Sequence, residues 1–203
     1  IRPHIAREKS QRAKFVAEAQ ATSQLEHPGI PPVHDIGVTP EGRLWFTMKL
    51  VRGRTLKEVL KDLLIGVRPV KREWNLHKLI TVLERVAEAL HFAHEKGVIH
   101  RDLKPENIML GEYGEVHVMD WGVAKLTGEV TEEALEEAVS VSDAGSGDET
   151  IDGQVKGTIA YMSPEQASGK AAAIDRRSDV YALGCLLYEI LTLHPAFKSE
   201  GMA

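Results

Sequence analysis

Residues 100–107 of this chain have the sequence His-Arg-Asp-Leu-Lys-Pro-Glu-Asn, and residues 120–122 have the sequence Asp-Trp-Gly. The two stretches bring together carboxylate, amide and ammonium groups within a short length of chain. Phosphoryl transfer needs alignment of the reactants and neutralisation of charge on the transferred group more than it needs covalent help. This combination of groups therefore predicts a phosphoryl-transfer site.

Each polar side chain of the two stretches has a predicted task. Asp102 is placed to accept or orient the proton of an attacking hydroxyl, and Lys104 can stabilise a γ-phosphate. Asn107 and Asp120 offer the oxygen ligands that Mg²⁺ prefers. Asp102 and Asn107 lie in a loop that follows a long predicted helix. The helix gives the reacting groups a rigid support.

The composition excludes several other classes of protein. The chain has 203 residues, of which 43% are hydrophobic and 27% charged, with a net charge of -5. These values are typical of a globular protein and make nucleic acid an unexpected partner. The only cysteine is Cys185, so one chain can form neither a disulfide framework nor a cysteine-based zinc site. Without a signal peptide or about 18 consecutive apolar residues, we expect a cytoplasmic location, with any membrane tether outside this chain.

Hydrophobic periodicity and turn residues predict the order of the elements. We expect helices over about 7–25, from the capping box at Thr55 onward, over 75–96 and over 178–191, and strands over 33–38, 44–50, 108–110 and 116–119. The last helix is apolar nearly all round, which predicts full burial. Residues 126–155 hold nine acidic and no basic residues and predict a loop.

By these motifs the chain resembles the bacterial Hanks-type (eukaryotic-like) serine/threonine protein kinases. The resemblance covers the family's αC helix to its αF helix. It implies an α+β, two-lobed protein-kinase-like fold. Residues 1–50 would form an incomplete small lobe of αC and two strands, and residues 51–203 a mostly helical large lobe without its last helices. The activation loop would span residues 120–165.

The resemblance also implies ATP and Mg²⁺ as cofactors and assigns residues to them. Glu18 matches the αC glutamate that pairs with a nucleotide-binding lysine. Met48 matches the gatekeeper, the backbones of Lys49 and Val51 would bond adenine, and Met109 would lie under the purine. Asn107 and Asp120 would bind the metal.

Further positions match the segments that receive the substrate and brace the loop. Thr158 would hydrogen-bond Asp102 and Lys104, as in the Ser/Thr branch, and Ser163 stands where Ala is more usual. Asp179 would brace the backbone of the catalytic loop. Trp121 replaces the common Phe and should pack against His100.

Regulation and metal binding elsewhere are also predicted from the sequence. Arg101 precedes the catalytic Asp, as in kinases that a phosphate in the activation loop switches on. Thr150 is the leading candidate phosphosite, with Ser140, Ser142 and Ser146 as alternatives. His91 and His94 are spaced three apart on a helix but have no third ligand nearby. We therefore expect them to be ordinary helix residues.

Two family features are absent from the sequence. No Gly-rich loop or Val-Ala-x-Lys strand precedes the αC helix, and the helix that supplies an Arg partner to Glu165 is lacking. We expect residues 1–203 alone to have little activity, with part of the apolar αF surface exposed.

Three functions remain open on the sequence. The first is a kinase that phosphorylates Ser/Thr of protein substrates and autophosphorylates its activation loop, with a homodimer as a possible arrangement. The second is a pseudokinase or scaffold that lacks the ATP-clamping lysine. The third is a small-molecule phosphotransferase.

Overall fold

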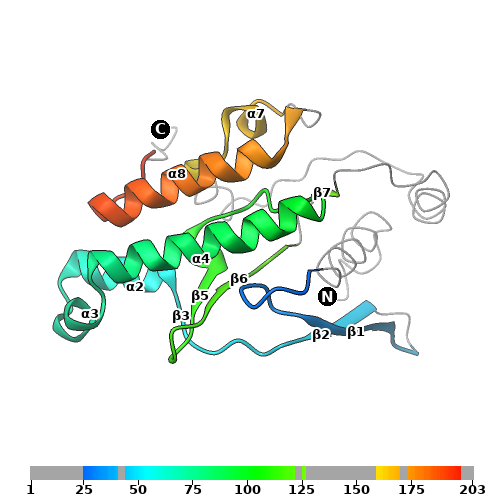
Figure 1. Cartoon of the computed structure of the whole chain (residues 1–203), viewed down its shortest axis with the longest axis horizontal. Coiled ribbons are helices and arrows are strands. Elements are labelled where there is room, and N and C mark those ends of the chain that lie inside the picture. The colour runs from blue at the N-terminus through cyan, green and yellow to red at the C-terminus, as the bar shows by residue number, and fades with distance from the viewer. Residues whose placement is uncertain (1–24, 41–43, 122–124, 127–158, 170–172, 198–203) are drawn as a thin grey trace.

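The computed structural model describes residues 25–40, 44–121, 125–126, 159–169 and 173–197. Glu18, Thr150 and Thr158 lie outside these ranges. The described elements are β1 (Val33–Val38), β2 (Leu44–Met48), β3 (Arg54–Thr55), α2 (Leu56–Ile65), α3 (Arg68–Glu73), α4 (Leu76–Glu95), β4 (Val98–Ile99), η2 (Pro105–Asn107), β5 (Ile108–Leu110), β6 (Val116–Val118), β7 (Lys125–Leu126), η3 (Ile159–Tyr161), α7 (Pro164–Ala167) and α8 (Arg176–Thr192). Figure 1 shows a sheet part that holds β1 and β2 and a helical part built around α4. This arrangement is the α+β fold that the sequence predicted.

In the sheet part, β1 and β2 pair antiparallel, with Ile36 opposite Phe46 and Gly37 opposite Trp45. The Trp45 ring lies across Gly37, so that a Cβ added there would come within 2.6 Å of the ring. A side chain at position 37 would therefore force the Trp45 ring to move. The backbone N–H of Lys49 donates to the carbonyl of Pro32 at 3.1 Å, which holds the chain leaving β2 beside the start of β1.

The first two long helices begin at side-chain caps that the sequence specifies. Thr55 and Glu58 form the predicted capping box of α2, in which the Thr55 N–H donates to Glu58 Oε2 at 2.8 Å. Asn75 Oδ1 accepts from the N–H of Lys78 at 2.9 Å and begins α4. The predicted helix over 75–96 is therefore confirmed.

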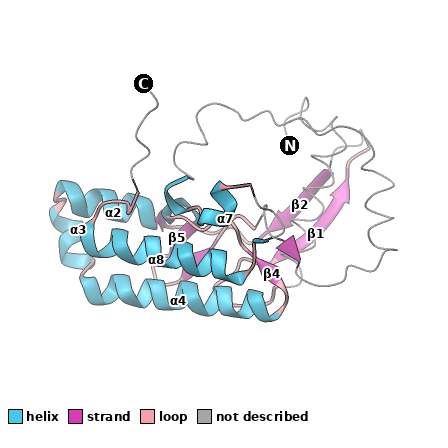
Figure 2. Cartoon of the chain, turned by 90° about the horizontal axis from the view of Figure 1, so that it is seen from above, coloured by secondary structure: helices cyan, strands magenta, loops and turns pink. Residues whose placement is uncertain are grey.

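The core is built from buried residues of α2, α4, α8 and the short strands. Within it, α4 and α8 run side by side (Figures 1 and 2). The buried residues of α4 recur every three or four positions and face α8 and the β5–β6 hairpin; they are Leu79, Val82, Val86, Ala89, Leu90 and Ala93. The expectation that the last helix is fully buried is wrong, because Val180, Tyr188 and Leu191 of α8 are exposed. The other expectation, that part of the apolar surface of the helix matched to the family's αF is exposed, is confirmed by these same residues of α8.

Three short strands connect the helices to the site. β3, β5 and β6 form one antiparallel sheet, and β4 pairs with β7. Gly53 precedes β3 with φ 142°, and a Cβ there would lie 2.1 Å from the carbonyl oxygen of Leu110. Only glycine allows this close approach of the two backbones. The hairpin of β5 and β6 is the one predicted, one residue shorter at its end.

None of the helices in the described part of the chain has the length and apolar character that a membrane span requires.

Two leucines of α4, one on its buried face and one exposed, should differ in how much they contribute to stability. Leu90 is 1% exposed and Leu76, on the same helix, is 53% exposed. Leu90→Ala should lower the free energy of unfolding by about 2–5 kcal/mol, because it leaves a cavity in the core. Leu76→Ala should change it by less than about 0.5 kcal/mol. Urea denaturation followed by circular dichroism measures both, and equal effects would contradict the assigned face.

Candidate active site

The loop of residues 100–107 begins directly after β4 and ends in η2. His100 and Leu103 are fully buried and fasten the loop to the core, whereas Asp102 and Lys104 are half-buried. Arg101 has φ 70° and Asp120 has φ 59°, and both are left-handed conformations that residues other than glycine rarely adopt. Such conformations persist only where surrounding contacts impose them, and they concentrate at functional sites.

Three of the predicted residues meet in this loop. Lys104 Nζ donates to Asp102 Oδ2 at 2.5 Å, and the two side chains form an ion pair. Asn107 Nδ2 donates to the backbone carbonyl of Asp102 at 2.8 Å and lies 3.4 Å from Asp102 Oδ2. With its nitrogen turned toward Asp102, Asn107 keeps its amide oxygen as an acceptor for other groups.

Asp120 reaches the same place through the β5–β6 hairpin. The N–H of Met119 donates to the carbonyl of Asn107 at 2.7 Å, so the residue before Asp120 is bonded to the loop. Asp120 itself is exposed. A carboxylate and an amide oxygen suit Mg²⁺, which prefers oxygen ligands and keeps several waters. Asn107 and Asp120 are thus the residues that would hold this ion.

His100 joins the loop to the hairpin through both ring nitrogens. Its Nδ1 accepts from the N–H of Asp102 at 3.2 Å, and its Nε2 donates to the carbonyl of Met119 at 3.0 Å. The ring packs edge-on against Trp121, with centroids 4.7 Å apart, and Trp121 Nε1 donates to the carbonyl of Val118 at 3.0 Å. The predicted packing of Trp121 on His100 is confirmed.

Asp179 braces the loop from α8. Its Oδ2 accepts from the N–H of His100 and its Oδ1 from the N–H of Arg101, both at 2.9 Å. His94 Nε2 on α4 donates to Oδ2 at 2.7 Å. The predicted bracing by Asp179 is confirmed. His94 lies on a helix at the edge of the core, as expected, but its bond to Asp179 was not predicted. Its spacing on the helix gave no sign of a partner 85 residues away.

The charge of Asp179 depends on these three donors. Burial by itself raises the pKa of a carboxyl group, but the hydrogen bonds from His94 and from the two backbone N–H groups outweigh it, and the pKa of Asp179 lies below its usual value. The carboxylate is therefore ionised at neutral pH although only 1% of the residue is exposed.

η3 and the first turn of α7 are each anchored to α8 by a further hydrogen bond. Tyr161 Oη donates to Glu189 Oε2 at 2.5 Å, and burial with this bond raises the pKa of Tyr161. Ser178 Oγ donates to Glu165 Oε1 at 2.5 Å. Glu165, which the sequence left without its expected Arg, thus bonds to the first turn of α8. These contacts fix the segment that the resemblance assigns to the substrate.

The predicted adenine-binding residues lie at the junction of the sheet and helical parts. Met48 lines a cavity of about 250 Å³ together with Val33, Asp120 and Trp121, which places the predicted gatekeeper beside the predicted metal ligand. Met109 is half-buried in β5 and pairs with Thr55 and His117. Lys49 and Val51 line a second cavity of about 340 Å³. The adenine contacts of all four residues remain predictions.

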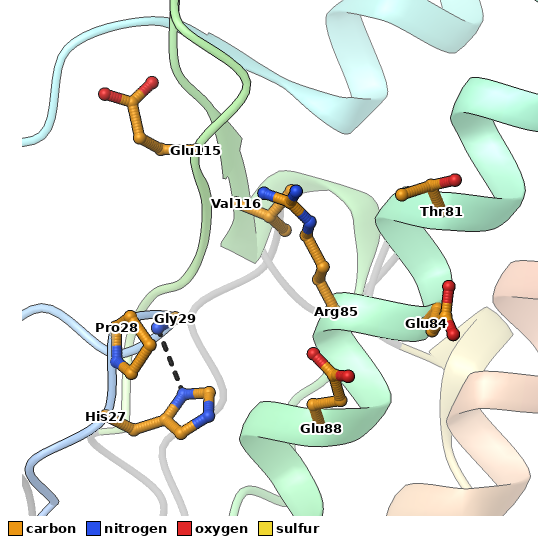
Figure 3. Close-up of a pocket in the computed structure, with 9 residues that line it drawn as sticks. All are labelled: His27, Pro28, Gly29, Thr81, Glu84, Arg85, Glu88, Glu115 and Val116. Carbon is orange, nitrogen blue, oxygen red and sulfur yellow. Dashed lines mark hydrogen bonds between the residues drawn. The ribbon is translucent and has the colours of Figure 1, made fainter.

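A larger cavity lies away from this chemistry. It measures about 510 Å³ and is bounded by the 27–29 turn, by α4 and by the hairpin (Figure 3). The Arg85 guanidinium, which points into this space, donates to the carbonyl of Gly114 at 2.8 Å. His27 Nδ1 accepts from the N–H of Gly29 at 3.0 Å. These polar groups are engaged with the backbone, so volume alone does not mark a functional site here.

Arg101 is the predicted regulatory residue that the structure describes. Its side chain is half-buried, and burial lowers its pKa, although the nearby Asp179 opposes this effect. Its function as a partner of an activation-loop phosphate remains a prediction, since Thr150 is outside the described residues.

The buried carboxylate gives a pH-dependent prediction. Asp179→Asn should lower the free energy of unfolding at pH 7 by about 3 kcal/mol or more, because an amide nitrogen would then face an N–H donor. The stabilisation by Asp179 is fully present above its unfolded pKa of about 3.9 and is lost as the pH falls through its lower folded pKa. The difference between wild type and variant should therefore shrink below about pH 4. Denaturation curves from pH 7 to pH 3 measure it, and Asp35→Asn, at an exposed residue, is the control. A constant difference would refute this account.

Comparisons with known proteins agree with this geometry. The family model "Protein kinase domain" matches residues 3–203. Serine/threonine-protein kinase PknD of Protochlamydia amoebophila is 40% identical over 202 residues, which are 98% of this chain and 20% of that protein. Serine/threonine-protein kinase PknB of Mycobacterium tuberculosis is 38% identical over 204 residues, 99% of this chain and 29% of that protein. The chain spans less than a third of the length of these relatives. Because the family model matches nearly the whole chain, the chain belongs to the protein kinase family.

Proposed function

We propose that this chain is the catalytic part of a serine/threonine protein kinase, which transfers the γ-phosphate of ATP to Ser or Thr hydroxyls of protein substrates. The observation that carries the proposal is the meeting of Asp102 with Lys104 and Asn107 beside the backbone that leads to Asp120. The names of the relatives support the Ser/Thr class.

In this proposal the carboxylate of Asp102 accepts the proton of the substrate hydroxyl. Lys104 is 2.5 Å from that carboxylate, so its ammonium lies where the transferred phosphoryl group meets the hydroxyl. Asn107 holds the Asp102 backbone and so limits the motion of the base.

Asn107 and Asp120 would hold Mg²⁺, which when bound neutralises charge on the phosphates. The bond from Met119 to the carbonyl of Asn107 keeps the two ligands on adjoining strands of backbone. Met48, Lys49, Val51 and Met109 would form the adenine site. Glu18 and Thr158 keep the functions that the resemblance gives them.

Regulation follows from the same proposal. A phosphate on Thr150 would supply about -1.5 to -2 units of charge for Arg101 to bind. Since Arg101 directly precedes Asp102, ordering of its side chain would act next to the base.

Loss of the proposed base tests the function. Asp102→Asn should lower kcat about 10²- to 10⁴-fold, because the amide cannot accept the hydroxyl proton, and should leave the KM for ATP nearly unchanged. The measurement is transfer of labelled γ-phosphate from ATP to a protein substrate by the full-length protein, followed by identification of the phosphorylated amino acid.

Glu84→Gln, at an exposed residue of α4 beside the cavity that lies away from this chemistry, removes one negative charge and serves as the control. Transfer that survives Asp102→Asn would refute the proposal. Labelling of a small hydroxyl compound in place of protein would indicate a small-molecule phosphotransferase, and ATP-independent partner binding without transfer would indicate a scaffold.

A further inference from the structure

The short helix α7 contacts the catalytic loop through the side chain of Gln166. Its Nε2 donates to the backbone carbonyl of Arg101 at 2.6 Å. Its Oε1 accepts from the backbone N–H of Ser163 and from the Ser163 hydroxyl, both at 3.1 Å. Because a backbone carbonyl can only accept and a backbone N–H can only donate, the orientation of the Gln166 amide is fixed by its partners.

The carbonyl that Gln166 holds belongs to the peptide bond that joins Arg101 to Asp102. The N–H of the same peptide bond donates to His100 Nδ1 at 3.2 Å. Both polar atoms of this peptide unit are therefore bonded to side chains. The N–H of Arg101 itself donates to Asp179, and Arg101 has a left-handed φ of 70°. A backbone held in this disfavoured region needs such contacts on each side.

The chemistry at position 166 is more specific than helix capping requires. Ser163 and Gln166 form a capping box at the start of α7, and Ser163 is fully buried. Glutamate serves in a capping box as well as glutamine does. A carboxylate, however, has no hydrogen to donate to the carbonyl of Arg101. The amide is thus needed for the contact with the catalytic loop and not for the helix.

We propose that Gln166 and Ser163 are positioning residues for phosphoryl transfer, which fix the peptide bond before Asp102 and thereby the direction of its carboxylate. The Ser163 hydroxyl orients the Gln166 amide, and the amide holds the carbonyl of Arg101. Ser163 and the first residues of α7 belong to the segment that the resemblance assigns to the substrate, so the same contact links that segment to the residue before the base. This inference rests on the proposed function.

The test compares Gln166→Glu, Gln166→Met and Ser163→Ala with wild type in the full-length protein. Gln166→Glu should lower kcat about 10- to 100-fold, because a carboxylate oxygen would face the carbonyl of Arg101 and displace the base. Gln166→Met, which removes the bond without repulsion, should lower kcat less, and Ser163→Ala least. The KM for ATP should stay within about twofold of wild type in each case, because the adenine site is untouched.

Ser168→Ala is the matched control. Ser168 Oγ donates to the carbonyl of Pro164 at 2.7 Å, so this change also removes a hydrogen bond of α7 but none to the catalytic loop. Its kcat should stay within about twofold of wild type. If Gln166 served only the helix, Gln166→Glu would keep wild-type kcat, since it preserves the capping box, and that result would overturn the proposal.

Hydrogen exchange measured on peptides that cover residues 100–107 gives a second readout. Gln166→Met should speed exchange of these amides relative to wild type, and Ser168→Ala should not. Equal exchange in the two variants would overturn the proposal whatever the kinetics show. If phosphoryl transfer by the wild-type protein did not depend on Asp102, the proposed function would be refuted. The hydrogen-exchange comparison would still decide whether Gln166 fixes the loop.

Discussion

The structure depends on one buried carboxylate. Asp179 extends from α8 and accepts hydrogen bonds from His94 on α4 and from two consecutive backbone N–H groups at the start of the catalytic loop. An ionised group inside a protein is tolerated only when its hydrogen-bonding capacity is filled, and here three donors fill it. The need to satisfy this charge sets the distance between the two long helices and the shape of the loop that lies on them.

A second set of contacts fixes the positions of the proposed reacting groups relative to this loop. His100 ties the N–H of Asp102 to the carbonyl of Met119, and Trp121 packs on its ring. The proposed base and the proposed metal ligand Asp120 are therefore placed by the same imidazole. Their relative position follows from bonds within the helical part, whereas the residues proposed for adenine lie where the sheet part joins it.

The elements that were predicted correctly are those whose residues interact with near neighbours in the sequence. The capping box at Thr55, the periodic α4 and the hairpin before Asp120 were predicted because their information lies within a few residues. Helix α3 was not predicted, since Pro69 and the basic residues after it show no apolar period. β4 and β7 have two residues each and exist only because distant segments pair. His94 and Gln166 were missed for the same reason, with partners 85 and 65 residues away.

The buried position of Asp179 has a consequence for how activity can be controlled. Movement of α8 away from α4 would break the three hydrogen bonds to Asp179, so the conformation of the loop is coupled to the contact between the two helices. Loosening of the loop alone is opposed by the same hydrogen bonds. Under the proposed function, a phosphate bound by the Arg101 side chain would therefore act on a loop whose backbone Asp179 already holds in place.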